Sequence, residues 1–332
     1  MVYIYKKKVG NKSYYYLRAS QKKDGKMITK DIAYLGNTLN DVRKELEKIP
    51  KYKTEIRKAY KNITNFLESN RYIEKVQSMK LKKDDLIGDK LIEVEACRQH
   101  YMGEFLRQEK LTKEEIWRNF IIDFAFNTAS IEGNTINLAE VRELLENEKT
   151  PKNKTLREIY DLQNTESVFN EILLSKDKIS NEFIIGIHKK LLDKIDKRIG
   201  YRNQDVRVIR ANFKATPAPY VKTDMDLLMR WFNKNKDKLH PLVLACVFHH
   251  KFEKIHPFMD GNGRTGRILL NYILLDNNYP PVIIRNKNRE KYLRVMRKAD
   301  KSDLTKSEVE DYANLVEFVS NEVVSSYWTI FL

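Results

Sequence analysis

The twelve residues HPFMDGNGRTGR at positions 256–267 include a histidine, an aspartate, an asparagine, three glycines and two arginines, directly before the apolar run ILLNYILL. The preceding stretch PLVLACVFHHKFEKI predicts a helix that ends at His256, because Pro257 disfavours helical backbone in the residue before it. The stretch RTGRILLNYILLD predicts the next helix. The sequence therefore predicts two helices joined by a polar, glycine-rich loop.

This loop contains the parts of an anion-binding site. Its glycines let backbone N–H groups converge on one point, and the start of a helix favours negative charge. Arg264 and Arg267 are three residues apart, share one helix face and can donate in pairs to phosphate. Asp260 is a hard oxygen ligand suited to Mg²⁺, and His256 is a candidate general base. Phosphoryl and nucleotidyl transfer need this combination of groups.

Each of these features alone has a structural explanation. A histidine at a helix end is usually structural, and DGNG is a common turn. Their occurrence together at one helix start favours a functional interpretation. The string is not a Walker A loop, because the Gly-Lys-Ser/Thr ending is missing.

The same string resembles the signature of the Fic family, His-x-Phe-x-(Asp/Glu)-Gly-Asn-Gly-Arg-x-x-Arg, with every defined position filled. The resemblance extends over roughly residues 111–320 and implies the all-helical Fic fold. It also implies transfer of AMP from ATP to a protein hydroxyl, with pyrophosphate released. By this resemblance His256 deprotonates the hydroxyl, Asp260 holds Mg²⁺, and Phe258 anchors the loop. The residues implied to bind the nucleotide are Gly261, Asn262, Gly263, Arg264, Thr265, Gly266 and Arg267, the last at the γ-phosphate.

Two further segments resemble parts of that family. GYRNQDVRVIRANFKATPAP at 200–219 is similar to a short β-hairpin flap that covers the nucleotide and pairs with the target segment. REKYLRVMRKAD at 289–300 is similar to the segment that contacts adenine and ribose, although Leu293 and Asp300 replace residues that are frequently Tyr and Asn. The residues that these two resemblances place at the nucleotide are Val208, Ile209, Arg210, Ala211, Tyr292, Leu293 and Asp300.

The stretch NTASIEGN at 127–134 resembles the inhibitory motif of the family, (Ser/Thr)-x-x-x-Glu-(Gly/Asn), through Thr128, Glu132 and Gly133. The resemblance implies that Glu132 pairs with Arg267 and so takes the place meant for the γ-phosphate. The alternative is that these residues only end a helix, with Gly133 in the left-handed conformation.

The chain is expected to have three zones. In residues 1–38, apolar and polar residues alternate on both sides of an Asp-Gly turn, and this pattern predicts a small β meander. Residues 39–110 predict a helical N-terminal region, and residues 111–332 the mainly α Fic domain with its inhibitory helix at about 116–131. Thr112 and Glu115 form a capping-box pattern at the start of that helix.

Most of the positive charge lies in the first zones. Residues 1–100 contain 24 lysines and arginines against 13 acidic residues, a net charge of +11 out of +16 for the chain. This imbalance favours acidic partners or nucleic acid, and tyrosines beside lysines in the meander could stack on bases. The alternative for the charge is a solvated Lys/Glu surface, and the alternative for the tyrosines is the core of a small sheet. The pattern alone favours these two alternatives.

Composition excludes several other classes of protein. No run of about 18 apolar residues occurs, so no membrane span and no membrane partner are expected. The N-terminus lacks the apolar region of a signal peptide, and Cys97 and Cys246 are isolated, with no metal-type spacing. We therefore expect reduced cysteines and a cytoplasmic location.

The sequence leaves several functions open. The leading hypothesis is a self-inhibited protein adenylyltransferase that uses ATP and Mg²⁺ on an unidentified target protein. The same fold could work as a hydrolase that removes AMP, could transfer UMP, phosphate or phosphocholine, or could serve as the switch of a nucleic-acid-binding regulator. A homodimer is common in the family, and the sequence leaves the oligomeric state open.

Overall fold

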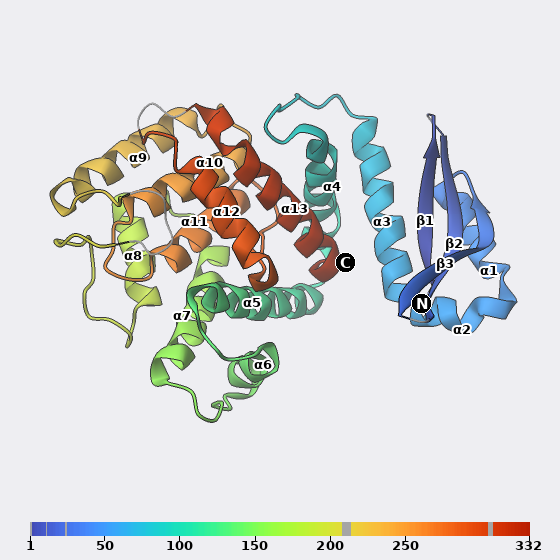
Figure 1. Cartoon of the computed structure of the whole chain (residues 1–332), viewed down its shortest axis with the longest axis horizontal. Helices are drawn as coiled ribbons and strands as arrows, with labels where there is room; N and C mark the ends of the chain where they lie inside the picture. The colour runs from blue at the N-terminus through green and yellow to red at the C-terminus, as the bar shows by residue number, and fades with distance from the viewer. Residues whose placement is uncertain (1, 11, 24, 208–213, 305–307) are drawn as a thin grey trace. The chain divides into compact units, whose positions relative to one another are not determined.

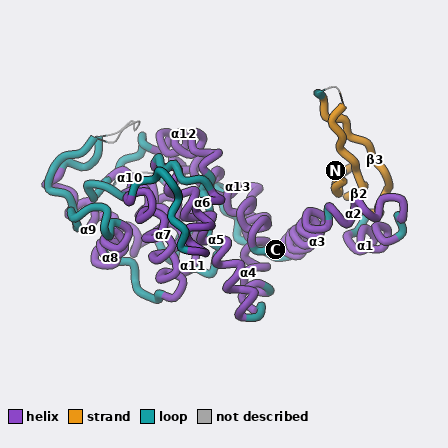
Figure 2. Tube along the Cα trace, turned by 90° about the horizontal axis from the view of Figure 1, so that it is seen from below, coloured by secondary structure: helices purple, strands orange, loops and turns teal. Residues whose placement is uncertain are grey.

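The computed structural model describes residues 2–10, 12–23, 25–207, 214–304 and 308–332. They fall into two compact units that divide between residues 81 and 82 (Figure 1). Strands occur only in the N-terminal unit of the described chain, and helices make up the C-terminal unit (Figure 2). The division falls inside the charged stretch KLKKDDLIGDK at 80–90, which is a linker in composition.

The N-terminal unit is a three-stranded antiparallel meander with helices packed on one face. Strands β1, β2 and β3 pair in sequence order, and α1 and α3 contribute Val42, Ile63 and Leu67 to the core beneath them. The Thr38 side chain caps α1 in a capping box with Asp41. The elements are β1 Val2–Val9, β2 Lys12–Lys23, β3 Lys26–Gly36, α1 Leu39–Glu47, α2 Lys53–Lys58 and α3 Tyr60–Gln77.

This partition differs from the three zones expected from the sequence. The helices up to Gln77 belong with the sheet, because a small sheet with one apolar face needs helices to cover it. The following helix, Leu91–Gly103, belongs instead to the C-terminal unit.

The C-terminal unit is helical throughout its regular structure. Asn137 and Thr155 cap α6 and α7 in capping boxes, which explains where these helices begin. The helices are α4 Leu91–Gly103, α5 Lys110–Glu132, α6 Leu138–Asn147, α7 Leu156–Leu174, α8 Asn181–Leu191, α9 Val221–Asn235, α10 Pro241–Ile255, α11 Asn262–Asp276, α12 Arg289–Ala299 and α13 Ala313–Ile330.

Helices α10 and α11 form the central hairpin of this unit. Both are buried on nearly all sides, as expected of helices that are apolar all round. Helices α9 and α13 pack on α10, while α5, α7 and α8 pack on α11. The loop that joins α10 to α11 is the HPFMDG segment, so the fold surrounds this loop with packed helices.

Aromatic packing fixes the position of α5. Phe124 contacts Phe169 of α7 with ring centroids 4.7 Å apart, and Trp117 contacts Phe331 beyond α13 at 5.3 Å. The helix begins at Lys110 without a side-chain cap, so the start predicted from Thr112 and Glu115 is wrong by three residues, nearly one turn. Lys110 and Leu111 are good helix formers and extend the helix backwards.

Two further sequence expectations concern the flap and the membrane. The edge residues of the expected flap fall within 208–213, outside the described residues, and the described residues on either side, 206–207 and 214–217, form no strand. Among the helices that the structure describes, none has the length and apolar character needed to cross a membrane.

Candidate active site

The loop between α10 and α11 is closed by its own residues. His256 and Gly261 both adopt left-handed backbone, with φ of 54° and 77°. The Asn262 side chain accepts from the Phe258 N–H and donates to the Phe258 carbonyl, both at 2.9 Å. In this structure the amide group of Asn262 thus holds the loop in shape.

Phe258, the residue expected to anchor the loop, lies in the interior. It is fully buried, and its ring stacks on His188 of α8 at a centroid separation of 3.7 Å. Burial lowers the pKa of His188 to about 4, so its neutral ring can donate from Nε2 to the Asp260 carbonyl at 3.1 Å. Sequence reasoning missed His188, although the pattern EFIIGIHKKLL places it on the buried helix face with Ile184 and Leu191.

Two glycines in this segment allow carboxylates to approach the backbone. A Cβ atom at Gly263 would collide with Oε1 of Glu132, and one at Gly266 would lie 2.6 Å from Oε1 of Glu253. Gly263 is in the first turn of α11, where backbone N–H groups have no partner within the helix. The structure therefore places the Glu132 carboxylate where the sequence predicted that an anion would bind.

His256 has the protonation state of a general base. Its Nδ1 lies 3.3 Å from the Glu253 carbonyl, so the Nδ1–H donates and Nε2 keeps its lone pair. Burial lowers the pKa of His256 to about 4, and the Glu253 carbonyl only partly opposes this. The ring is therefore neutral at physiological pH and 20% exposed.

Arg202 ties the loop to the segment expected to form the flap, and sequence reasoning missed it. This buried guanidinium donates to the His256 carbonyl at 2.8 Å and to the Gln204 carbonyl at 2.9 Å. It also donates to the Thr216 carbonyl. Arg202 thus links His256 to residues on both sides of the undescribed 208–213. The arginine in GYRNQDV gave no signal of this, because its carbonyl partners His256 and Thr216 lie 54 and 14 residues away in the chain.

The remaining charges of the loop are paired with α7. Arg264 forms a buried ion pair with Asp161, and its guanidinium lies 3.5 Å from Asp260. Arg157 pairs with the other oxygen of Asp260. Burial alone would raise the pKa of Asp260, but Arg264 and Arg157 lower it below its ordinary value. Asp260 is therefore an ionised, partly exposed carboxylate. The sequence pattern did not reveal Asp161 or Arg157, since both lie about 100 residues away from the loop.

Arg267 is held by the end of α5. Its Nε donates to Thr128 Oγ1 at 2.6 Å, and one terminal nitrogen donates to Glu132 Oε1 at 2.7 Å. Gly133 adopts left-handed backbone with φ of 105° and ends the helix. Two hydrogen bonds tie this end of α5 to residues 286–289. Arg289 Nε donates to the Ile131 carbonyl, and the Asn127 side-chain oxygen accepts from the Asn286 N–H. The structure thus combines both interpretations of NTASIEGN: the residues end a helix, and Glu132 contacts Arg267.

The expected adenine contacts lie mainly in the interior. Tyr292 is 3% exposed and shares a hydrogen bond of 2.7 Å with His249. Asp300 has a 5% exposed side chain and accepts from His250 at 3.0 Å. Leu293, which follows Tyr292 in the sequence, is partly exposed. The structure therefore does not bring Asp300 to an open position at the loop. The expected flap contacts Val208, Ile209, Arg210 and Ala211 lie outside the described residues.

Glu253 is a further acid behind the loop that sequence reasoning missed. Its Oε2 lies 3.9 Å from His256 Nδ1, and its Oε1 has no hydrogen-bond partner among the described residues. Burial raises the pKa of Glu253 to about 8, opposed by Arg267 and supported by Glu132. The carboxyl is therefore neutral in the folded protein over most of the physiological range.

Glu253→Gln is expected to stabilise the protein more at pH 8 than at pH 5. The folded protein holds a proton on Glu253 that the unfolded chain loses above its ordinary pKa. The wild type therefore loses stability as pH rises between about 4.5 and about 8, at most about 1.4 kcal/mol per pH unit. Glutamine removes this loss because it does not ionise. Melting temperatures of both proteins at the two pH values test this, and an equal difference at pH 5 and pH 8 would refute it.

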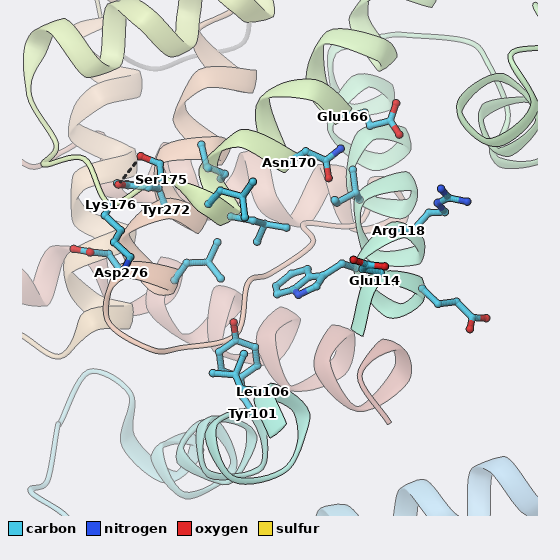
Figure 3. Close-up of a pocket in the computed structure, with 17 residues that line it drawn as sticks. Tyr101, Leu106, Glu114, Arg118, Glu166, Asn170, Ser175, Lys176, Tyr272 and Asp276 are labelled. Carbon is cyan, nitrogen blue, oxygen red and sulfur yellow. Dashed lines mark hydrogen bonds between the residues drawn. The ribbon is translucent and has the colours of Figure 1, made fainter. Parts of the chain in front are cut away.

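A cavity lies at the other end of α11. Its volume is about 1070 Å³, and it is lined from α5, α7 and α11 by residues such as Arg118, Glu166 and Asp276 (Figure 3). No residue of 256–267 lines it. The candidate site is therefore assigned from the geometry of the loop and not from cavity size.

Comparison with known proteins identifies the family of this region. Residues 178–274 match the model of the Fic/DOC family. The protein adenylyltransferase Fic of Drosophila ananassae is 34% identical over 189 residues, which cover 54% of this chain and 37% of that protein. The chain thus spans little more than a third of the length of the curated relatives it matches.

Solved structures share the fold. A Fic domain containing signaling protein from Bacteroides thetaiotaomicron has a TM-score of 0.66 at 21% identity, covering 72% of this chain and 96% of that chain. A Fic family protein from Desulfovibrio desulfuricans has a TM-score of 0.61 at 26% identity, covering 73% and 75%. The mainly helical fold predicted from the sequence is confirmed.

Proposed function

This chain carries a Fic/DOC domain, and from that premise we propose that it is a self-inhibited protein adenylyltransferase. It moves AMP from ATP to a Tyr, Thr or Ser hydroxyl of another protein and releases pyrophosphate. The observation that carries the proposal is a neutral His256 beside the start of α11, with Arg264 and Arg267 on the same helix.

The chain's own groups account for the chemistry. Nε2 of His256 takes the proton from the target hydroxyl as its oxygen bonds to the α-phosphorus. The bond from that phosphorus to the oxygen bridging to the β-phosphate breaks, so pyrophosphate leaves. The first amides of α11 and the two arginines stabilise the charge on the phosphates. Arg202 acts as a positioning residue, because it holds the His256 carbonyl.

Asp260 suits the Mg²⁺ that this reaction would use. It is ionised and partly exposed, and Mg²⁺ is usually bound by one or two protein carboxylates together with substrate phosphates. When bound, the ion would neutralise phosphate charge in the transferring nucleotide. To bind it, the carboxylate would leave its contact with Arg157, whose side chain is 56% exposed and free to turn away.

Asp260→Ala is expected to reduce transfer by roughly 10²-fold or more and to remove its dependence on Mg²⁺, because a divalent ion contributes several kcal/mol to such reactions. Asp276→Ala, at the far end of the helix that follows the loop, is the matched control and should leave both unchanged. Rates measured against Mg²⁺ concentration, in a Glu132→Gly background, test the assignment. Activity that survives in Asp260→Ala with the same metal response would remove Asp260 from the metal site.

Self-inhibition is supported by the contact of Glu132 with Arg267 and Gly263. A carboxylate there neutralises the guanidinium meant for the γ-phosphate and repels a phosphate at the start of α11. Bound ATP would then place its α-phosphate wrongly for attack by the hydroxyl. Glu132 is 43% exposed on its side chain, so it can be displaced without unfolding the core.

Hydrolysis of AMP from a modified protein is the alternative, since Glu132 near the loop could orient a water molecule. The two functions give opposite results with one variant. If Glu132→Gly releases AMP from a pre-modified protein more slowly than the wild type and shows no gain in transfer, the chain is a hydrolase.

We also propose a cytoplasmic location and a homodimer. Cys97 and Cys246 are free and buried, which suits a compartment that keeps thiols reduced. The homodimer rests on the family resemblance alone, and light scattering of the purified chain tests it.

A further inference from the structure

The sheet of the N-terminal unit presents two faces of different character. Side chains alternate between the faces along each strand. One face holds Val2, Ile4, Tyr15 and Leu17 and packs on the helices. The opposite face, called the tyrosine face below, carries Tyr3, Tyr5, Tyr14, Tyr16 and Tyr34, together with Lys7 and Arg18.

The register brings these rings together in a row. Tyr5 pairs with Tyr16, and Tyr16 pairs with Tyr34, so one tyrosine from each strand lies side by side. The rings of Tyr16 and Tyr34 have centroids 5.4 Å apart. The Arg18 guanidinium lies 3.6 Å from the centre of the Tyr5 ring. Three strands thus build a continuous aromatic surface with a cation stacked on it.

These rings are not core residues, which corrects the interpretation favoured by the sequence pattern. Tyr15 alone among the sheet's tyrosines is buried in the core. Tyr34 is 50% exposed, and the other four on the tyrosine face are partly exposed. Alternation along SYYYL sends Tyr15 inward and its two neighbours outward.

The charge around this surface is strongly positive. Residues 1–81 contain 20 lysines and arginines against 8 acidic residues, a net charge of +12. Residues 1–36 alone contain nine basic residues against two acidic ones. Of those two, Asp31 is paired with Arg18 at 2.6 Å. A partner for this surface must therefore be an anion, and it must also offer flat faces to the rings.

We propose that the tyrosine face binds single-stranded nucleic acid. Bases stack on Tyr16, on Tyr34 and on the Arg18 guanidinium that covers Tyr5, and phosphates are held by lysines along the strands, such as the exposed Lys7. A single strand fits because its bases expose their flat faces, whereas a duplex hides them inside its stack. Recognition by stacking and charge predicts little preference among base sequences.

The test is fluorescence anisotropy of the full chain with labelled oligonucleotides of about 16 nucleotides, the upper site size of comparable surfaces. Separate measurements use single-stranded DNA, single-stranded RNA and duplex DNA, and their affinities show which kind of nucleic acid the surface binds. Tyr16→Leu and Tyr34→Leu keep apolar bulk but remove the ring, and each should weaken single-strand binding roughly tenfold. Tyr16→Phe and Tyr34→Phe keep the ring and should bind as the wild type does.

Two controls separate stacking from charge and from folding. Tyr60→Leu removes a 68% exposed tyrosine on α3 and should change nothing. Lys7→Gln should reduce the slope of affinity against salt, whereas the tyrosine variants should leave that slope unchanged. Melting curves of all variants exclude unfolding.

Four outcomes would overturn the proposal: no binding of single strands, equal or tighter binding of duplex, or equal loss in the Leu and Phe variants. The fourth is displacement of the oligonucleotide by polyglutamate at the same charge concentration, which would point to an acidic protein instead.

Discussion

Replacing Glu132 with glycine is expected to raise AMP transfer, including labelling of the protein by itself, on the order of 10²-fold above wild type. Glu132 holds the Arg267 guanidinium at 2.7 Å and sits against Gly263. Its removal frees both for the γ-phosphate, so the α-phosphate can turn toward the attacking hydroxyl. An error of about 1 Å in that position can cost on the order of 10²-fold in rate.

A double variant tests whether the gain runs through Arg267. Adding Arg267→Ala to Glu132→Gly should abolish the gain, because the freed guanidinium is then absent. The two changes should therefore be strongly non-additive, as expected of groups that act together. Glu115→Ala is the matched control: this exposed glutamate lies on the same helix about 25 Å away and should leave transfer unchanged.

Unchanged or lower transfer by a folded Glu132→Gly protein would remove the self-inhibition account. NTASIEGN would then be only a helix end, or Glu132 would serve hydrolysis. The geometry alone permits the first of these, since Gly133 does end α5 in the left-handed conformation.

His256→Ala is expected to reduce transfer by roughly 10² to 10⁴-fold while ATP binding stays nearly intact. A general base acts on the target hydroxyl and not on the nucleotide, and the neutral imidazole of His256 keeps its Nε2 unprotonated. Transfer rates in the Glu132→Gly background and ATP affinities by calorimetry give the two quantities separately.

The pH profile adds a second check on His256. Its pKa is lowered to about 4, so protonation should not reduce transfer between pH 7 and pH 5, as it would for a histidine with an ordinary pKa of about 6.5. If His256→Ala loses ATP binding and transfer equally, the residue is structural.

Sequence reasoning succeeded where structure is local in the chain. Proline and glycine punctuate 256–267, so the helix that ends before His256 follows from local preferences, while the next helix starts at Asn262, two residues before the predicted stretch. The contact of Glu132 with Arg267, 135 residues apart, was accessible only through the family motif.

Sequence reasoning failed where a site is built from distant pairs. Arg202, Asp161 and Glu253 carry no pattern of their own, and their roles arise from packing against carbonyls, arginines and the loop. The tyrosines of the meander show a related limit. Alternation predicts that neighbours point to opposite faces, but only the register and the covering helices decide which face is buried.

The central claim is tested most directly by the source of the transferred label. Glu132→Gly protein is incubated with Mg²⁺, a lysate and ATP labelled on either the α- or the γ-phosphate, and protein-bound label is measured after separation. Adenylyl transfer predicts label on protein from α-labelled ATP and none from γ-labelled ATP. The double variant Glu132→Gly/His256→Ala should leave protein unlabelled with either form of ATP. Label from the γ-phosphate, or no label from the α-phosphate, would contradict it.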